Sequence, residues 1–170
     1  MILSQLIGDK IISASTEAFS LHERSKFGEK QENKIVYSYA EAIFLVQQNK
    51  MQVYSGEKIL DFESLLKKLK RLDKKIEIKS IVFSDLRKKG YIVKSALKFG
   101  GEFRVYEKNV KPGEDHARWI VFVLKENTPL PLHEFAAKAR VAHSTKKHLL
   151  IAIVDEEMDV SYYEVSWIKL

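Results

Sequence analysis

The residue best placed to move a proton is a histidine in a polar loop. His116 follows Asp115 and comes just before a strongly apolar segment, 117–124. Loops held at the ends of buried strands often carry functional residues. An imidazole changes charge near physiological pH, as a general acid requires. A single loop histidine is also a common surface residue, and by itself the sequence favours that plainer interpretation.

A tyrosine lies at the end of the preceding predicted strand, 102–108. Phe103 and Val105 alternate along it and should face a core. Arg104 and Tyr106 then point to the opposite, polar face. Beside an arginine at a strand end, Tyr106 is placed for solvent or a ligand. The alternative is a strand-favouring aromatic residue at the rim of a sheet.

A predicted helix over 132–146 brings basic side chains to the same half of the chain. The positions expected to be buried are Leu132, Phe135, Ala136, Ala139 and Ala142. Arg140 lies on the other side, and Lys147 follows seven positions later, so both project alike if the last turn persists. A solvated basic face, or cations placed against the helix dipole, would explain the same pattern.

Other catalytic chemistries lack their sequence patterns. No two of the five histidines are spaced as in a zinc-protease motif, and there is no cysteine. There is no glycine-rich phosphate loop before a helix and no Gly-x-Ser-x-Gly elbow. The one dense carboxylate group, 155–159, lacks the glycine and the length of a calcium loop and indicates a hairpin tip. We therefore expect neither a metal site nor a cofactor.

Composition indicates a folded protein with a basic surface. The 170 residues suffice for one large domain or two small ones, and 45% are hydrophobic. Lysine and arginine outnumber aspartate and glutamate 29 to 23, and the net charge of +6 suits a polyanionic partner. The N-terminus lacks a signal peptide's apolar region, and no apolar run approaches the roughly 20 residues of a membrane span. We expect a cytoplasmic protein.

The first half of the chain predicts a small α/β subdomain. Two short strands over 2–14 surround Gly8-Asp9, a turn dipeptide, whereas 16–34 has no regular pattern. Ser38 begins a helix with a capping box. Asp61 begins a second helix with an apolar stripe. Its other face is basic, and such faces are usually only solvated; the cations are Lys67, Lys68, Lys70 and Arg71.

A polar stretch at 72–76 marks the predicted boundary between two domains, 1–75 and 76–170. The second domain should contain a helix over 77–89 and then these strands: 91–99 and 102–108 joined through Gly100-Gly101, a central strand at 117–124, and a pair at 149–155 and 160–168. The predicted fold class is therefore α/β of the mixed α+β kind. A small N-terminal subdomain precedes a mixed central sheet flanked by helices.

Three segments in order resemble a known family, the archaeal and eukaryotic tRNA-splicing endonucleases. DLRKKGYIVKSALKFGGEFRVYEKN (85–109) resembles their helix, glycine and hairpin ending in the catalytic tyrosine. PGEDHARWIVFVL (112–124) resembles the histidine loop and the strand after it. Residues 138–170 resemble the arginine-containing helix, the catalytic lysine and the closing hairpin, and 38–53 is similar to a helix of the N-terminal domain. The resemblance implies a catalytic subunit.

The resemblance also implies the site residues. The family's tyrosine falls on Tyr106 and its histidine on His116. Its lysine comes two residues before the apolar strand, which selects Lys147 over its neighbour Lys146. Arg140 matches an arginine that stacks on an unpaired RNA base. The family's second clamping arginine, in the C-terminal hairpin, has no counterpart here.

Enzymes of this family cleave a bulge-helix-bulge in precursor tRNA and leave a 2′,3′-cyclic phosphate and a 5′-hydroxyl. The RNA's own 2′-hydroxyl attacks, so the resemblance implies metal-independent chemistry. Tyr106 would be the general base; a free phenol has a pKa of about 10, so nearby cations such as Lys147 must favour the phenolate. His116 would protonate the leaving oxygen, and Lys147 would stabilise the charge on the phosphorane.

Excision of an intron takes two cuts, and this chain carries one Tyr-His-Lys set. A homotetramer, or a heterotetramer with a related subunit, is therefore expected. In the family an acidic loop of one dimer docks into a basic pocket of another, and 155–159 resembles that loop. Two alternatives remain: a non-catalytic RNA-binding partner subunit, and a metal-dependent DNA nuclease, which would need an acidic cluster that the sequence lacks.

Overall fold

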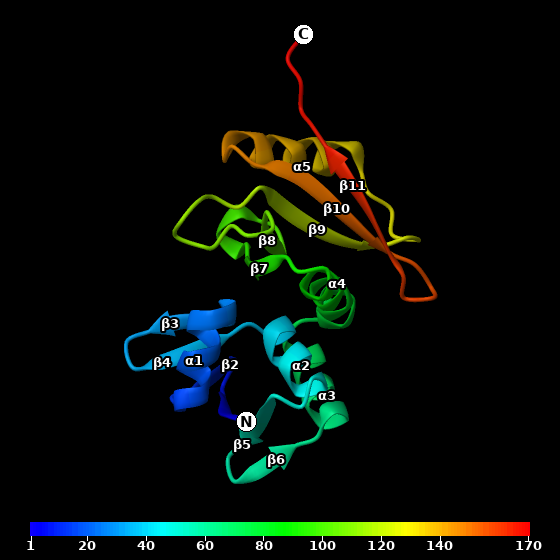
Figure 1. The fold of residues 1–170 in the computed structure, drawn as a ribbon. Coiled ribbons are helices and arrows are strands. Elements are labelled where there is room, and N and C mark those ends of the chain that lie inside the picture. The colour runs from blue at the N-terminus through cyan, green and yellow to red at the C-terminus, as the bar shows by residue number, and fades with distance from the viewer. The chain divides into compact units, whose positions relative to one another are not determined.

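The computed structural model describes the whole sequence, residues 1–170, as two compact units, Met1–Phe83 and Ser84–Leu170. Each unit contains one β-sheet (Figure 1). Five α-helices, one short 3-10 helix and eleven strands make the chain a mixed α+β protein, which confirms the predicted fold class. No helix combines the length and the apolar character needed to cross a membrane.

The N-terminal unit contains six strands, three helices and the first part of a fourth. Its elements are β1 (Ile2–Ile7), β2 (Lys10–Ser13), α1 (Thr16–Ser25), β3 (Glu29–Gln31), β4 (Lys34–Tyr37), α2 (Tyr39–Gln47), β5 (Met51–Ser55), β6 (Lys58–Leu60), α3 (Phe62–Leu72) and the start of α4 (Ile76–Lys88). The strand order is β3-β4-β2-β1-β5-β6. Gly8 and Asp9 form the predicted turn between β1 and β2, and β1 also pairs in parallel with β5.

The prediction of an irregular segment over 16–34 is wrong, because α1 and β3 lie there. Ser15 Oγ accepts the N–H of Ala18 at 3.3 Å and begins the helix. Lys26 ends it in the left-handed conformation, with φ of 58°. Only Ala18 is fully buried in α1, so the helix shows no apolar stripe by which sequence periodicity could reveal it.

The capping box predicted at Ser38 is present, and it also holds a neighbouring turn. One carboxylate oxygen of Glu41 accepts the N–H and the Oγ–H of Ser38, each at 2.9 Å. The other oxygen accepts the N–H of Gly28 at 2.8 Å. Glu41 is only 4% exposed, so these charge-assisted hydrogen bonds replace the water that its carboxylate loses.

The C-terminal unit contains a five-stranded sheet of order β11-β10-β9-β8-β7. Its elements after α4 are β7 (Ile92–Ser95), η1 (Leu97–Phe99), β8 (Phe103–Tyr106), β9 (Trp119–Lys125), α5 (Leu132–Ser144), β10 (His148–Val154) and β11 (Val160–Val165). β9 is central, as its continuous apolar run predicts. It pairs in parallel with β10 and antiparallel with β8, so the sheet is mixed, as predicted.

The hairpin predicted over 91–108 is present but shorter, because the 3-10 helix η1 replaces the end of its first strand. Gly101 explains the close approach of this turn to β9. A Cβ atom at Gly101 would lie 2.5 Å from Ile120 Cγ2 and 3.2 Å from the carbonyl oxygen of Val121. A side chain at this position would therefore push the turn away from the central strand.

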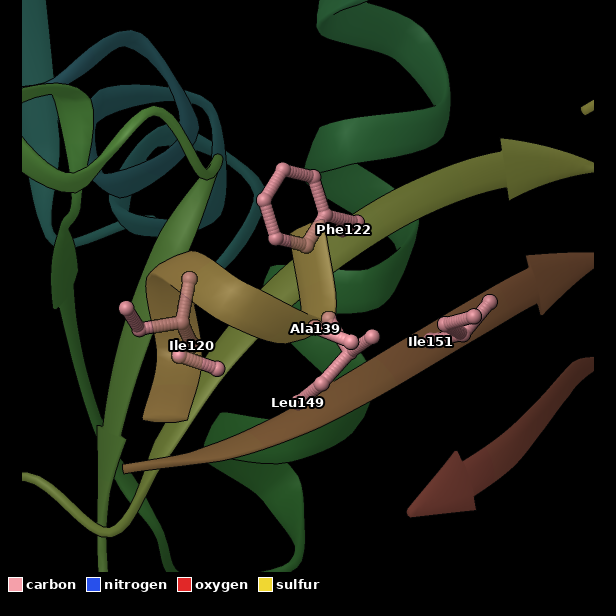
Figure 2. Packing of buried hydrophobic residues seen from close by; sticks show 6 residues of the cluster. Ile120, Phe122, Ala139, Leu149 and Ile151 are labelled. Carbon is pink, nitrogen blue, oxygen red and sulfur yellow. The ribbon is translucent and has the colours of Figure 1, made fainter. Parts of the chain in front are cut away.

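One core lies between α5 and the sheet of the C-terminal unit. Its buried members come from β9, α5 and β10: Ile120, Phe122, Ala139, Ala142, Leu149 and Ile151. Figure 2 labels all of them except Ala142. The prediction that Leu132 and Ala136 are buried is wrong. Both are exposed, Leu132 by 83%, because α5 meets the sheet through the small side chains of Ala139 and Ala142.

The helix α5 also ends earlier than predicted. Its last residue is Ser144, and Lys146 adopts the left-handed conformation with φ of 57°. Lys147 therefore lies beyond the helix. The expectation that Arg140 and Lys147 project from one helical face is wrong, because the last turn does not persist.

Candidate active site

The end of β8 and the starts of β9 and β10 lie side by side at one edge of the C-terminal sheet. β9 and β10 run in parallel with His148 opposite Trp119, so these strands begin side by side. β8 is antiparallel to β9, so its last residue reaches the same edge. Tyr106 ends β8, His116 lies just before β9, and Lys147 lies just before β10. Strand pairing alone brings these three distant residues to one place.

A pocket of about 380 Å³ opens at this edge, and all three predicted catalytic residues line it. The complete lining is Phe99, Arg104, Tyr106, Gly113, Glu114, Asp115, His116, Ala117 and Lys147. Arg140 lies elsewhere, exposed on α5. Lys146 is exposed and does not line this pocket, although it lines a neighbouring one.

Tyr106 forms part of the pocket wall and does not lie in open solvent. It is 5% exposed, whereas Arg104, two positions earlier on β8, is half-buried. The Tyr106 hydroxyl makes no hydrogen bond to another protein group. The phenol is therefore available to a molecule bound in the pocket.

His116 lies in a loop whose backbone is ordered by hydrogen bonds and by a glycine. The N–H of Glu114 donates to the carbonyl of Lys111 at 3.0 Å, and Gly113 adopts φ of 94°, which favours glycine. The Asp115 carboxylate accepts the backbone N–H of His116 at 2.6 Å. These contacts fix the backbone and leave the imidazole exposed without a hydrogen bond inside the protein. Both ring nitrogens are therefore available to hydrogen-bond a ligand.

Backbone contacts around the turn after α5 hold Lys147. Its N–H donates to the carbonyl of Ala142 at 2.9 Å, and its Nζ donates to the carbonyl of Thr145 at 3.0 Å. Nζ also lies 5.0 Å from the ring centre of Phe99. Partial burial, and secondarily the nearby charge of Arg104, lower the pKa of the Lys147 ammonium. The pocket therefore holds two cations close enough to influence each other.

This arrangement suits an anionic ligand that must exchange protons. A phenol, an imidazole and two cations surround one space, and no group of three or more His, Cys, Asp or Glu side chains gathers as metal ligands anywhere in the chain. The only carboxylates lining the pocket are Glu114 and Asp115, and Asp115 already accepts a backbone hydrogen bond.

The sequence analysis does not predict Arg104 and Phe99, the two pocket residues that act on Lys147, as site residues. Arg104 could have been found, since it alternates with Tyr106 on one face of β8. Phe99 gave no usable signal, because its approach to Lys147 depends on the turn η1 where an extended strand was predicted.

Comparison with known proteins matches the two halves of the chain to two domains of one family. Residues 76–162 match the family model "tRNA intron endonuclease, catalytic C-terminal domain", and residues 2–66 match "tRNA intron endonuclease, N-terminal domain". The tRNA-splicing endonuclease of Pyrococcus abyssi is 42% identical over 165 residues, which cover 96% of this chain and 95% of that protein.

Two further archaeal relatives, also named tRNA-splicing endonuclease, extend this similarity. The protein of Thermococcus kodakarensis is 39% identical over 170 residues, 99% of each chain, and that of Methanothermobacter thermautotrophicus is 34% identical over 165 residues, 96% of each. The chain is therefore an endonuclease. It belongs to the tRNA intron endonuclease family, which confirms the resemblance found in the sequence.

Proposed function

We propose that this endonuclease acts in the cytoplasm on precursor tRNA and cleaves it at bulge-helix-bulge splice sites. The observation that carries the proposal is the single pocket lined by Tyr106, His116 and Lys147. The names of the relatives support the substrate. The alternative, a non-catalytic RNA-binding partner subunit, gives no reason for these three side chains to share one pocket.

The proposed chemistry belongs to the C-terminal domain, 76–170, and needs no metal. Tyr106, as phenolate, accepts the proton of the RNA 2′-hydroxyl, and that oxygen attacks the adjacent phosphorus. His116, as imidazolium, gives a proton to the 5′ oxygen as its bond to phosphorus breaks. Lys147 stabilises the additional negative charge on the phosphorane. The products are a 2′,3′-cyclic phosphate and a 5′-hydroxyl.

The test is cleavage of a prefolded bulge-helix-bulge RNA by the full chain in excess EDTA, with the product ends identified. We expect a 2′,3′-cyclic phosphate and a 5′-hydroxyl. The matched control is the same RNA with a 2′-deoxynucleotide before each cut, which should resist cleavage because the nucleophile is missing. Strict dependence on a divalent metal, or cleavage of the deoxy substrate, would overturn the mechanism. Binding without cleavage would favour the partner subunit.

We propose that Arg140 stacks on an unpaired base of the bulge, where splayed RNA bases are accessible. Its exposure on α5 leaves the guanidinium plane free to do so. Arg140→Ala should weaken binding of the bulged RNA by about 1–3 kcal/mol and binding of a plain duplex less. Titration of both RNAs measures the difference, with Arg140→Lys as the variant that keeps the charge. Equal losses on the two RNAs would make Arg140 a phosphate contact only.

We further propose that the chain works as a tetramer, either of identical subunits or with a related partner. One chain offers one site for two cuts, and the turn after β10 presents acidic side chains. Asp155 Oδ1 accepts the N–H groups of Glu157 and Asp159, each at 2.9 Å, so Asp155 shapes the turn. Glu156 and Glu157 are exposed and offer their charges to a basic partner surface.

The variant Glu156→Lys with Glu157→Lys reverses both of those exposed charges and should dissociate the assembly. Asp155 is unchanged in it, so the turn keeps its shape. Sedimentation velocity at low and high salt measures the state, and Glu17→Lys with Glu29→Lys, on the exposed surface of the N-terminal unit, is the control for net charge. If the turn variant still assembles, the acidic turn does not form the contact between subunits. A wild-type monomer at both salt concentrations that still excises introns would refute the tetramer.

A further inference from the structure

The N-terminal unit carries a concave surface that differs in chemistry from the pocket of the C-terminal unit. It is a groove of about 450 Å³ between α3 and the hairpin of β5 and β6, called here the α3 groove. Its polar lining consists of four cations and two hydroxyl groups: Lys58, Lys67, Lys68, Arg71, Ser55 and Ser64. No carboxylate and no aromatic ring lines it.

Helical spacing explains this concentration of charge. Ser64, Lys67, Lys68 and Arg71 stand at i, i+3, i+4 and i+7, which places them on one stripe about 10 Å long. The apolar positions of α3 face the other way, where Leu65 and Leu69 are fully buried. Packing of the helix therefore fixes the basic stripe toward solvent.

Three cations of the α3 groove, Lys67, Lys68 and Arg71, have no carboxylate partner, whereas Lys58 interacts electrostatically with the carboxylate of Asp61. Lys68 Nζ donates only to Ser55 Oγ, at 3.2 Å. The nearby ion pairs use residues outside the groove: Lys70 with Glu77 at 2.9 Å, and Lys79 with Asp73 at 2.7 Å. Residues 64–75 contain six basic side chains and one acidic one.

We propose that the α3 groove binds the phosphodiester backbone of the RNA substrate, as a site separate from the pocket of the C-terminal unit. The identity of the RNA rests on the proposed function above. Lysine, arginine and hydroxyl donors match phosphate oxygens, and the absence of aromatic rings from the lining favours backbone contact over base reading. A stripe of separate cations fits a chain of successive phosphates, and each phosphate neutralised releases counterions.

The test measures binding of full-length precursor tRNA to the full chain carrying His116→Ala, so that the RNA is not cut. The groove variant adds Lys67→Gln and Arg71→Gln. The control adds Lys50→Gln and Lys74→Gln, two exposed cations of the same unit outside the groove, with the same change of net charge. Affinity is measured between about 50 and 200 mM salt, where counterion release dominates.

We expect the groove variant to bind roughly 10-fold more weakly or worse at about 0.1 M salt, and the slope of log affinity against log salt to become shallower by about one to two. The control should keep the affinity and the slope. Unchanged binding by the groove variant, or equal losses in both variants, overturns the inference while leaving the proposed function intact. A parent chain that does not bind precursor tRNA refutes the proposed function instead, and the groove's RNA role with it.

Sedimentation of the same variants tests the other possible occupant of the α3 groove, which is the acidic turn at 155–159 of another copy of this chain. If the groove variant changes the state of assembly while the assembled fraction binds RNA normally, the α3 groove holds a protein segment, and the inference is wrong. An unchanged state of assembly with weakened RNA binding supports it.

Discussion

Replacing His116 or Lys147 by alanine is expected to slow RNA cleavage by at least about 100-fold, with little change in fold or RNA affinity. Acid-base groups contribute about 10²–10⁴ to a rate, whereas affinity comes mainly from phosphate contacts. The His116 imidazole is exposed and makes no hydrogen bond within the protein, so its removal breaks no structural contact. Single-turnover cleavage at saturating enzyme measures the loss.

Lys146→Ala is the matched control for Lys147→Ala. The two lysines are adjacent, but only Lys147 lines the pocket with Tyr106 and His116. Greater damage from Lys146→Ala would move the catalytic assignment by one residue, and full activity of both variants would refute the mechanism. The lowered pKa of Lys147 adds a signature: its contribution should disappear with rising pH before an ordinary ammonium loses its proton.

Replacing Glu41 by alanine should lower the free energy of unfolding of the N-terminal unit by about 3 kcal/mol, because one buried and two part-buried donors lose a charged acceptor. The donors are the N–H and Oγ–H of Ser38 and the N–H of Gly28. The loss is larger than that of an ordinary helix cap, about 1 kcal/mol, since Glu41 also holds the turn at Gly28.

Ser38→Ala provides the matched comparison for Glu41→Ala, because it removes the cap hydroxyl and leaves the bond from Gly28 to Glu41 in place. Chemical denaturation followed by far-UV circular dichroism gives the stability. Tryptophan fluorescence reports on the other unit only, since Trp119 and Trp167 both lie in the C-terminal unit. Equal losses in the two variants would show that the Gly28 contact contributes nothing.

Sequence predicts elements well where the deciding interaction is local. The helix α2 follows from its capping box, α3 from Asp61 and a regular apolar stripe, and β9 from a continuous apolar run. Sequence does not predict the helix α1, because its cap is the only strong local signal it has. The predicted end of α5 lies too far along the chain, because a left-handed turn follows the helix at Lys146, a residue type with no preference for that conformation.

The site is harder to read because its geometry is long-range. Considered singly, Tyr106, His116 and Lys147 resemble a rim aromatic, a loop histidine and a solvated cation. Their meeting depends on the register that places His148 opposite Trp119, which no local pattern encodes. The family resemblance supplied the grouping in advance, and the sheet shows the physical means by which these side chains come to line one pocket.

The strand β10 separates two regions that can change independently. Its seven residues, His148–Val154, begin beside the candidate catalytic lysine and end at the acidic turn. At about 3.3 Å per residue the strand spans about 20 Å, beyond the Debye length of about 8 Å at physiological ionic strength. Substitutions in the turn can therefore alter the contact proposed for it without changing the electrostatics around Lys147.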